Sequence, residues 1–307
     1  MAGHRNTPAR VGVLFALCCL LLLGIMPVLA GARPQRFDSL TFATWLTVWQ
    51  LLCAAPPYIV ERARSRSSVP SDRKPAVTFI TLVTGVIFGV TTYMYVIAAE
   101  KAGAVNMSIA LQGYPLFAIL VEALFLGRRP SGRALGFTLL MIGALVYLTT
   151  GGTFRMAEVS GWSLFALGIP LLWSIAHIIL RRHLAARSLT PNQVTATRLV
   201  VSGIFLLILH ASLGSPARLL TELTDMHFQV AALSMGAVYY LELISWFHAM
   251  RHIDVSIASA VTVPAPAVTM LLSVLLLGQQ VQLYEVLALA VITIGMYGLL
   301  YTVARAR

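Results

Sequence analysis

Charged residues are scarce in this chain: only 11% of its 307 residues are Asp, Glu, Lys or Arg, whereas 58% are hydrophobic. Soluble domains carry about 25% charged residues, so this composition does not suit a protein surrounded by water. Cysteine is rare as well. Cys18, Cys19 and Cys53 all lie in apolar runs, without the spacing of a zinc site or a disulfide framework. The sequence therefore predicts an integral membrane protein with no metal ion and no cofactor.

The residue patterns of common enzymes are also missing. The sequence contains no HExxH, no GxSxG and no P-loop, and its four aspartates lie in connections or at the ends of apolar runs. His248 and His252 have the spacing of two metal ligands on a helix, but they have no third ligand, so a structural or incidental role is expected. These absences argue against an enzyme and exclude ATP-driven pumping by this chain.

Ten apolar runs fill almost the whole sequence. Each has about the 20 residues that a helix needs to cross the hydrocarbon core of a bilayer. They predict an all-α polytopic membrane protein with transmembrane helices over residues 11–31, 39–60, 76–99, 104–126, 133–150, 161–180, 192–213, 228–249, 254–277 and 283–303.

The distribution of Lys and Arg predicts the orientation. Of the 22 basic residues, 16 fall in the two ends of the chain and the even-numbered connections, and five fall in the odd-numbered ones. Because cytoplasmic connections are enriched in Lys and Arg, both termini should be cytoplasmic, in a cytoplasmic (inner or plasma) membrane. The net charge of +11 is thus explained by topology, and no nucleic-acid partner is expected.

The fourth and ninth runs repeat one pattern. Residues 104–127 and 254–278 match at a constant offset of 151 residues, at positions 108/259, 115/266, 120/271, 124/275, 126/277 and 127/278. The second copy comes five runs after the first, and an odd number of crossings reverses the direction of a helix. The chain should therefore contain a first repeat over 1–150, a hinge over 151–160 and an inverted second repeat over 161–307. Inverted repeats are typical of secondary transporters with a site near the bilayer midplane.

The second half also has a recognisable set of markers, at Trp173, Arg198, Pro266 and Leu277-Gly278. In this arrangement they resemble the EamA repeat of the drug/metabolite transporter superfamily. The first half carries the pattern less fully, with Pro115 and Leu126-Gly127. The resemblance covers about the whole chain. It implies ten spans in two inverted five-helix repeats, and export or uptake of small metabolites such as amino acids through a central cavity.

The sequence departs from the family pattern in two places. The family usually has Glu directly after Leu-Gly, whereas Arg128 and Gln279 stand there in this chain. The first half has Trp49 and Gln50 where an Arg is expected. An ion network built on the family's Glu residues after Leu-Gly is therefore not carried over to this protein.

Prolines interrupt both copies of the repeated helix. A proline removes a helical hydrogen bond and frees a carbonyl group, which is tolerated at membrane depth only where protein or a water-filled cavity satisfies it. Pro115, Pro264 and Pro266 are therefore predicted to be hinges at the cavity wall. The alternative is a packing kink without a role in transport.

Ionisable residues inside a predicted span are costly and usually functional. Glu242 is the only carboxylate well within a span, and Arg198 lies near the head of the seventh. Glu242 is predicted to bind a coupling proton or a substrate amine, or to form an ion pair with Arg198. A structural salt bridge for Glu242 and snorkelling of Arg198 to the interface are the alternatives.

Aromatic and polar residues complete the predicted substrate cavity, since they lie on spans that should face the other half. With Glu242, the candidates are Tyr93, Gln112, Trp173, His177, Tyr239 and Trp246. Such a pocket suits an amphipathic solute. The alternative is that the rings anchor the protein at the membrane interfaces.

Taken together, these features predict a secondary transporter, more specifically an exporter, with a small-molecule substrate, surrounding lipid and a proton as coupling ion, working as a monomer or homodimer. The alternatives are a non-transporting membrane scaffold and a transporter of sugar phosphates, nucleotide sugars or drug-like cations. Against anionic substrates, the only lysines are Lys74 and Lys101, both in connections. Against cations, no Glu precedes Glu61 in the first two spans.

Overall fold

The computed structural model describes residues 7–34, 36–64, 74–126, 131–185, 190–253 and 255–305, and no β-strand occurs among them. The first half contains α1 (Thr7–Gly31), α2 (Ser39–Arg64), α3 (Lys74–Lys101), α4 (Ala104–Leu111), α5 (Tyr114–Leu126) and α6 (Gly132–Thr149). A 3-10 turn, η2 (Met156–Glu158), follows. The second half contains α7 (Gly161–Ala185), α8 (Pro191–Leu213), α9 (Pro216–Leu223), α10 (Met226–His252), α11 (Val255–Thr262), α12 (Ala265–Leu277) and α13 (Leu283–Arg305).

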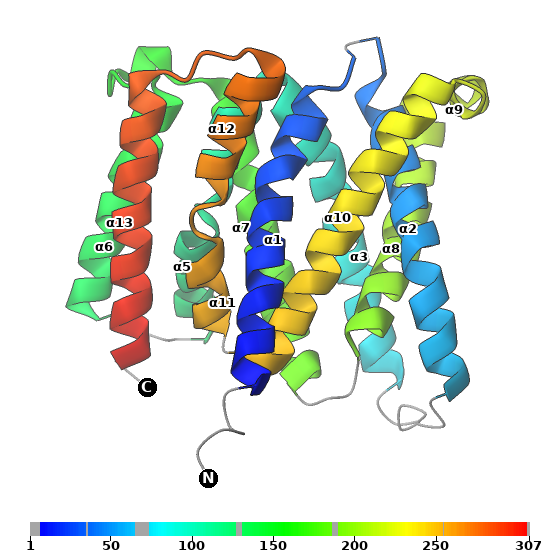
Figure 1. The fold of residues 1–307 in the computed structure, drawn as a ribbon, viewed down its shortest axis with the longest axis horizontal. Coiled ribbons are helices and arrows are strands. Elements are labelled where there is room, and N and C mark those ends of the chain that lie inside the picture. Colours follow the sequence, from blue (N-terminus) through cyan, green and yellow to red (C-terminus); the bar gives the residue numbers. More distant parts are fainter. Residues whose placement is uncertain are drawn as a thin grey trace.

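The helices form one bundle of roughly antiparallel elements (Figure 1). Within the described residues, eight helices are long and apolar enough to cross a membrane, judged by length and composition. Together with α2 and the pair α4–α5, which run in the same bundle, they account for ten passes. The predicted all-α polytopic fold is therefore confirmed. The end of the bundle where α1 begins and α13 ends is called the terminal face below, and the other end the opposite face.

The fourth and ninth passes are each split into two helices. The first break lies at Gln112 and Gly113, between α4 and α5, and the second at Val263 and Pro264, between α11 and α12. Pro115 and Pro266 fall at the second position of the helix that follows each break, where a proline's missing N–H costs no helical hydrogen bond. Gly127 and Asp254, which end and begin the two sequence copies, lie outside the described residues.

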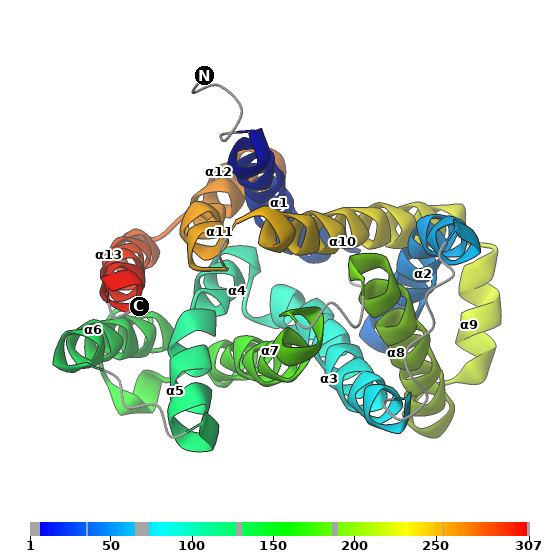
Figure 2. The same ribbon diagram turned by 90° about the horizontal axis from the view of Figure 1, so that it is seen from below.

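The first helix of each half packs on the other half. The amino-terminal helix α1 lies against α10, α11 and α12, and α7 lies in the corresponding way against α3, α4 and α5 (Figure 2). Each of these two helices is also hydrogen-bonded to the helix that follows the break in the other half: α1 to α12, and α7 to α5. The hydroxyl of Thr269 donates to the carbonyl oxygen of Gly24 at 2.8 Å, and that of Ser174 donates to the carbonyl oxygen of Tyr114 at 3.0 Å. Movement of either broken helix is therefore tied to the opposite half.

Two glycines allow further close crossings between the helices. A Cβ on Gly236 of α10 would lie 2.7 Å from the carbonyl oxygen of Leu46 on α2. A Cβ on Gly85 of α3 would lie 2.5 Å from the Cβ of Val201 on α8. The two glycines are 151 residues apart, which is the offset of the sequence repeat. A close helix crossing at a glycine thus occurs at corresponding positions of the two halves.

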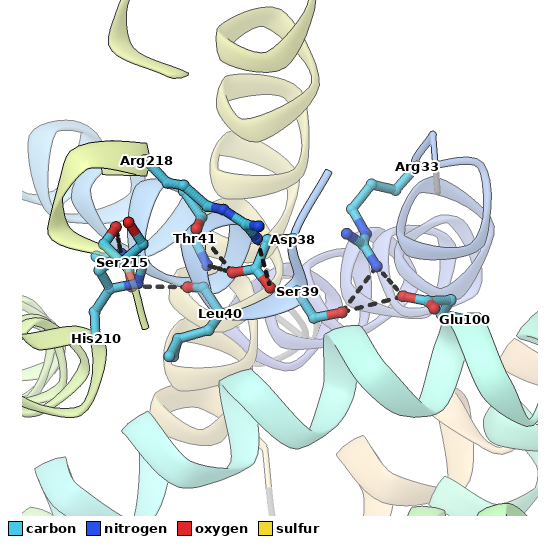
Figure 3. Close-up of polar contacts among 10 residues, drawn as sticks. Arg33, Asp38, Ser39, Leu40, Thr41, Glu100, His210, Ser215 and Arg218 are labelled. Carbon is cyan, nitrogen blue, oxygen red and sulfur yellow. Dashed lines mark hydrogen bonds and ion pairs between the residues drawn. The ribbon is translucent and has the colours of Figure 1, made fainter. Parts of the chain in front are cut away.

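Polar residues tie the helix ends together at the opposite face (Figure 3). Arg33 forms an ion pair with Glu100 at the end of α3, and both side chains also contact Ser39 at the start of α2. Arg36 pairs with Asp225, the N-cap of α10, at 3.4 Å. These contacts join the segment before α2, and the start of α2, to the ends of α3 and α10 at this face of the bundle.

Asp38 caps α2 in the same cluster. Its Oδ2 accepts hydrogen bonds from the amide and the hydroxyl of Thr41 at 2.9 and 2.8 Å, and Arg218 of α9 lies 3.9 Å from Oδ1. Partial burial acts to raise the pKa of Asp38, but the two hydrogen bonds and the nearby Arg218 outweigh it and hold the pKa below its usual value. The ionised form is therefore the one that stabilises this end of α2.

We expect Asp38→Ala to lower the free energy of unfolding by about 1 kcal/mol, because the N-cap acceptor is lost. Asp38→Asn keeps an acceptor oxygen and should lose less. The lowered pKa means that the ionised carboxylate contributes fully above its unfolded pKa of about 3.9, and that this contribution disappears as the pH falls through the folded value. Thermal unfolding of wild type and Asp38→Ala should thus converge in acid. A constant difference across the pH range would contradict this role.

The short helix α9 was not predicted from the sequence. It lies at the opposite face between α8 and α10, where the indole N–H of Trp45 donates to the carbonyl oxygen of Leu219 at 3.3 Å. Its Leu220 is 72% exposed, as expected for a helix whose apolar face meets lipid rather than protein. At eight residues, α9 is too short to be found by a search for spans.

Candidate functional site

A cavity of about 110 Å³ lies at the centre of the bundle, between helices of both halves. Its polar lining is Ser108, Gln112, His177, Arg198, Glu242 and Thr262, and its aromatic lining is Phe88, Tyr114, Trp173, Tyr239 and Trp246. Leu23, Leu111, Leu243, Ala265, Pro266 and Met296 complete it. A space of this size holds several water molecules or a small solute.

Both helix breaks open onto this cavity. Gln112 reaches it from the α4–α5 break, and Thr262 and Pro266 reach it from either side of the α11–α12 break. The other two predicted hinge residues do not line the cavity: Pro115 follows the first break, and Pro264 lies in the second. The duplicated element of the sequence thus supplies two walls of the site.

Glu242 reaches the cavity from the middle of α10 and is only 8% exposed. The thiol of Cys19, on α1, donates a hydrogen bond to its Oε1 at 3.4 Å. One helical turn along α10, the hydroxyl of Ser245 donates to the sulfur of Cys18 at 3.7 Å. The two consecutive cysteines of α1 therefore contact the polar face of α10, and one of them holds the carboxylate.

Arg198 is 3% exposed and lines the cavity from α8. Its guanidinium carbon lies 4.0 Å from the centroid of the Phe88 ring, which is a close cation–π contact. Its Nε has no hydrogen-bond partner among the described residues. The guanidinium is thus held flat against a ring while part of its hydrogen-bonding capacity stays unused.

The ion pair suggested by the sequence, Arg198 with Glu242, is not formed. Both residues line the cavity and each lies within reach of the other's charge. However, none of the salt bridges found among the described residues joins them. They are on different helices, α8 and α10, and the cavity leaves them as two separate charges of opposite sign.

His177 lies on α7, one turn beyond Trp173, and both line the cavity. Its ring centroid is 5.5 Å from that of Phe88 and 5.6 Å from that of Tyr114. Neither ring nitrogen has a hydrogen-bond partner in the described structure, although both are buried. A buried imidazole without partners is costly, so this ring is suited to a ligand or to water.

An aromatic cluster lies beside the cavity, on the side of the opposite face. Tyr95, fully buried on α3, lies 6.3 Å from Trp173 and 6.0 Å from Tyr239, measured between ring centroids. The indole N–H of Trp173 donates to the hydroxyl of Thr91 at 3.0 Å, which fixes its ring. Beyond this cluster lies the ion pair of Arg33 and Glu100.

The structure brings most of the predicted cavity residues together, except one. Gln112, Trp173, His177, Tyr239, Glu242 and Trp246 all line the cavity, as does Arg198. Tyr93 does not; it packs beside the buried core, because its neighbour Tyr95, not Tyr93, faces the second half. No sequence pattern singles out Cys19, which stands among the apolar residues of its run. Tyr114 could have been suspected from its place beside Pro115.

No group of three or more His, Cys, Asp or Glu side chains that could hold a metal ion occurs in the described parts of the chain. The pair His248 and His252 accordingly has no third ligand among the described residues. The ring of His248 stacks on Phe15 of α1, at 5.1 Å between centroids. Its surroundings are thus those of a packed side chain.

Comparison with known proteins gives a family and a fold. The model of the EamA-like transporter family matches residues 10–150 and, a second time, residues 160–301. A solved crystal structure, described only as that of a protein, has a TM-score of 0.65 and 17% sequence identity to this chain, over 94% of this chain and 96% of the other. At this identity the likeness shows a shared fold and nothing of the substrate. No curated protein matches the sequence significantly.

Proposed function

Because this chain belongs to the EamA-like transporter family, we propose that it is a secondary transporter that exports small metabolites such as amino acids. The observation that carries the proposal is the position of the cavity, between the two halves and against both helix breaks. Transporters of a membrane-embedded, inverted-repeat design bind their substrate at such a place. The family consists of transporters, which agrees with a protein that is not an enzyme.

Alternating access would use the two breaks as hinges. The Tyr95 cluster and the Arg33–Glu100 pair join helices on the side of the opposite face. Opening that face requires these contacts to separate while the terminal face closes. The backbone at Gln112–Gly113 and at Val263–Pro264 has no continuous helix to resist such a change, and Pro115, Pro264 and Pro266 prevent the helices from joining. We place the terminal face, with both chain ends, in the cytoplasm on the distribution of Lys and Arg.

Glu242 is the group we assign to proton coupling. It is the one carboxylate among the described residues that line the cavity, and it lies between α1 of the first half and α8 of the second. An intramembrane carboxylate that takes up a proton loses a costly buried charge, so its proton occupancy favours one state of the site over another. Exchange of a proton for a substrate at this position would link the two fluxes.

The test is flux into proteoliposomes that contain the purified protein. Labelled amino acids, nucleosides and organic cations are offered with and without an imposed pH gradient. We expect saturable transport of an amino acid that is accelerated by the gradient. Saturable transport that ignores the gradient would remove proton coupling from the proposal, and absence of flux for every solute would favour a membrane scaffold.

The contact between Cys19 and Glu242 predicts a role for a thiol. Cys19→Ala removes the hydrogen bond to the carboxylate and should raise the KM for transport about fivefold, the equivalent of about 1 kcal/mol. Cys19→Ser keeps a donor and should restore most of the affinity. Cys18→Ala, at the neighbouring position, is the matched control and should leave KM unchanged. Equal KM values for Cys19→Ala and wild type would show that the thiol does not position Glu242.

A further inference from the structure

The cavity contains one buried charge of each sign without pairing them. Among the described residues that line it, Arg198 supplies the guanidinium and Glu242 the carboxylate, and no salt bridge joins them. Burying a charge without a close partner is costly, and the cost is recovered only by an ion or dipole placed against it. A solute that carries both charges would satisfy both residues and add no net charge to the membrane interior.

The positive end of the cavity is suited to a carboxylate. Phe88 packs against one face of the Arg198 guanidinium, and the Nε of Arg198 has no partner in the described structure. His177, which lies within reach of the charge of Arg198, offers two further nitrogens without partners. The planar fork of an arginine matches the two oxygens of a carboxylate, and a neighbouring imidazole N–H can donate to the same group.

The negative end is suited to an ammonium group. Cys19 donates to Oε1 of Glu242, and the Glu242 side chain lines the cavity. The rings of Tyr239 and Trp246 lie on the same helix and line the same space. An ammonium group that meets a carboxylate beside aromatic rings gains both an ion pair and cation–π contacts.

The depth of the two charges sets an orientation. Arg198 is seven residues from the start of α8 at Pro191, and Glu242 is ten residues from the end of α10 at His252; both of those ends lie at the terminal face. At 1.5 Å per residue, Arg198 is about 10 Å and Glu242 about 15 Å from that face. The carboxylate end of the cavity is thus the one nearer the terminal face.

We propose that the cavity binds an amino acid in a fixed direction, with its carboxylate on Arg198 and His177, its ammonium group on Glu242, and an apolar side chain among the rings of Phe88, Tyr114 and Trp173. The inference rests on the proposed transport function and specifies how the substrate is held. A sugar phosphate would place its extra negative charge beside Glu242, with Arg198 as the only guanidinium in the described lining. A cation without a carboxylate would leave the Arg198 guanidinium without an anion and its Nε without a partner.

The experiment compares three ligands that differ only in the charged groups. Leucine, its decarboxylated amine and its deaminated acid are tested for binding to the purified protein by calorimetry, and the same set is repeated with phenylalanine. For wild type we expect the amino acid to bind about 100-fold more tightly than either analogue, the size of effect seen when one partner of a buried charge pair is removed. Binding is measured rather than flux, so that a variant without transport still gives a result.

Two variants then separate the ends of the site. Arg198→Gln should weaken the amino acid to the level of the amine and leave the amine almost unchanged, whereas Glu242→Gln should weaken the amino acid to the level of the acid. Arg198→Lys keeps the charge but not the planar fork, so its affinity for the amino acid should lie between those of wild type and Arg198→Gln. It replaces Arg198→Gln in the comparison if that variant does not fold. Trp162→Phe is the control and should match wild type, because Trp162 is exposed on α7 and lies outside the cavity.

Each other outcome contradicts the proposal in a distinct way. If Arg198→Gln weakens amino acid and amine equally, the carboxylate is not bound by Arg198. If wild type binds none of these ligands but transports another solute in proteoliposomes, the proposed amino-acid site on Arg198 and Glu242 is wrong, whereas the proposed transport function is retained. If it neither binds nor transports any solute of the panel, the proposed function fails together with this inference.

Discussion

Exchanging Glu242 for glutamine is expected to lower gradient-driven transport by about 100-fold or more. Glutamine is nearly the same size and keeps an acceptor for the Cys19 thiol, but it cannot gain or lose a proton and cannot pair with an ammonium group. Loss of an ion pair in a buried site costs about 3 kcal/mol or more, which corresponds to a factor of at least about 100. The measurement is initial uptake into proteoliposomes with an inward and an outward pH gradient.

A second buried carboxylate provides the control. Glu285 is 6% exposed and accepts a hydrogen bond from the amide of Gln282 at 2.8 Å, near the start of α13 and outside the cavity. Glu285→Gln should therefore keep the gradient response. If Glu242→Gln is as active as Glu285→Gln in both gradients, Glu242 has no part in coupling, and the cavity must work without a titrating carboxylate.

The substitution Gly236→Ala should destabilise the protein by about 3 kcal/mol, the upper part of the range for overpacking. The added Cβ would meet the backbone oxygen of Leu46 at 2.7 Å, the Cβ of Trp49 at 3.0 Å and the backbone nitrogen of Gln50 at 3.2 Å. Backbone atoms of a helix cannot rotate away as a side-chain tip can, so α10 and α2 must move apart. The indole of Trp49, which donates to Gln229 at 2.8 Å, would be displaced with them.

Gly203 is the matched control for this prediction. It lies on α8, and a Cβ there would meet only the methyl group of Thr47 at 3.9 Å, an ordinary contact. Gly203→Ala should therefore be neutral or stabilise by up to about 1 kcal/mol through helix propensity. The two variants are compared by thermal unfolding of the purified protein in detergent. A Gly236→Ala protein as stable as Gly203→Ala would mean that α2 and α10 do not cross as closely as described.

The sequence located the helix breaks only approximately, for a reason that applies to proline generally. The prolines at 115 and 266 suggested interruptions at those residues. The chain breaks two to three residues earlier, at Gln112–Gly113 and Val263–Pro264. Because proline lacks an N–H and has a fixed φ, it fits the first turn of a helix better than the middle. Pro115 and Pro266 therefore begin the second helix of each pair, whereas Pro264 lies in the second gap itself.

In the site, too, the sequence identified some residues, whereas only the structure showed how they are placed. Arg198 and Glu242 stand out in the sequence because charge is rare in apolar spans, and both line the cavity. The relative position of the Arg198 and Glu242 side chains does not follow from the limits of their spans, because a helix can rotate about its axis without any change in its hydropathy. That rotation decides that Tyr95 rather than Tyr93 faces Trp173 and Tyr239. It also decides that Cys19, indistinguishable from its apolar neighbours, contacts Glu242.

The amino-acid sequence by itself determined the membrane class, the positions of the passes and the duplicated broken helix, because a bilayer accepts only long apolar helices and the repeat is written in matching residues. The tertiary structure alone decided how those helices cross. The close contacts at Gly85 and Gly236, and the packing of α1 and α7 on opposite halves, place the two charges in one cavity without joining them. Such convergence depends on contacts between residues far apart in the chain, which no local pattern records.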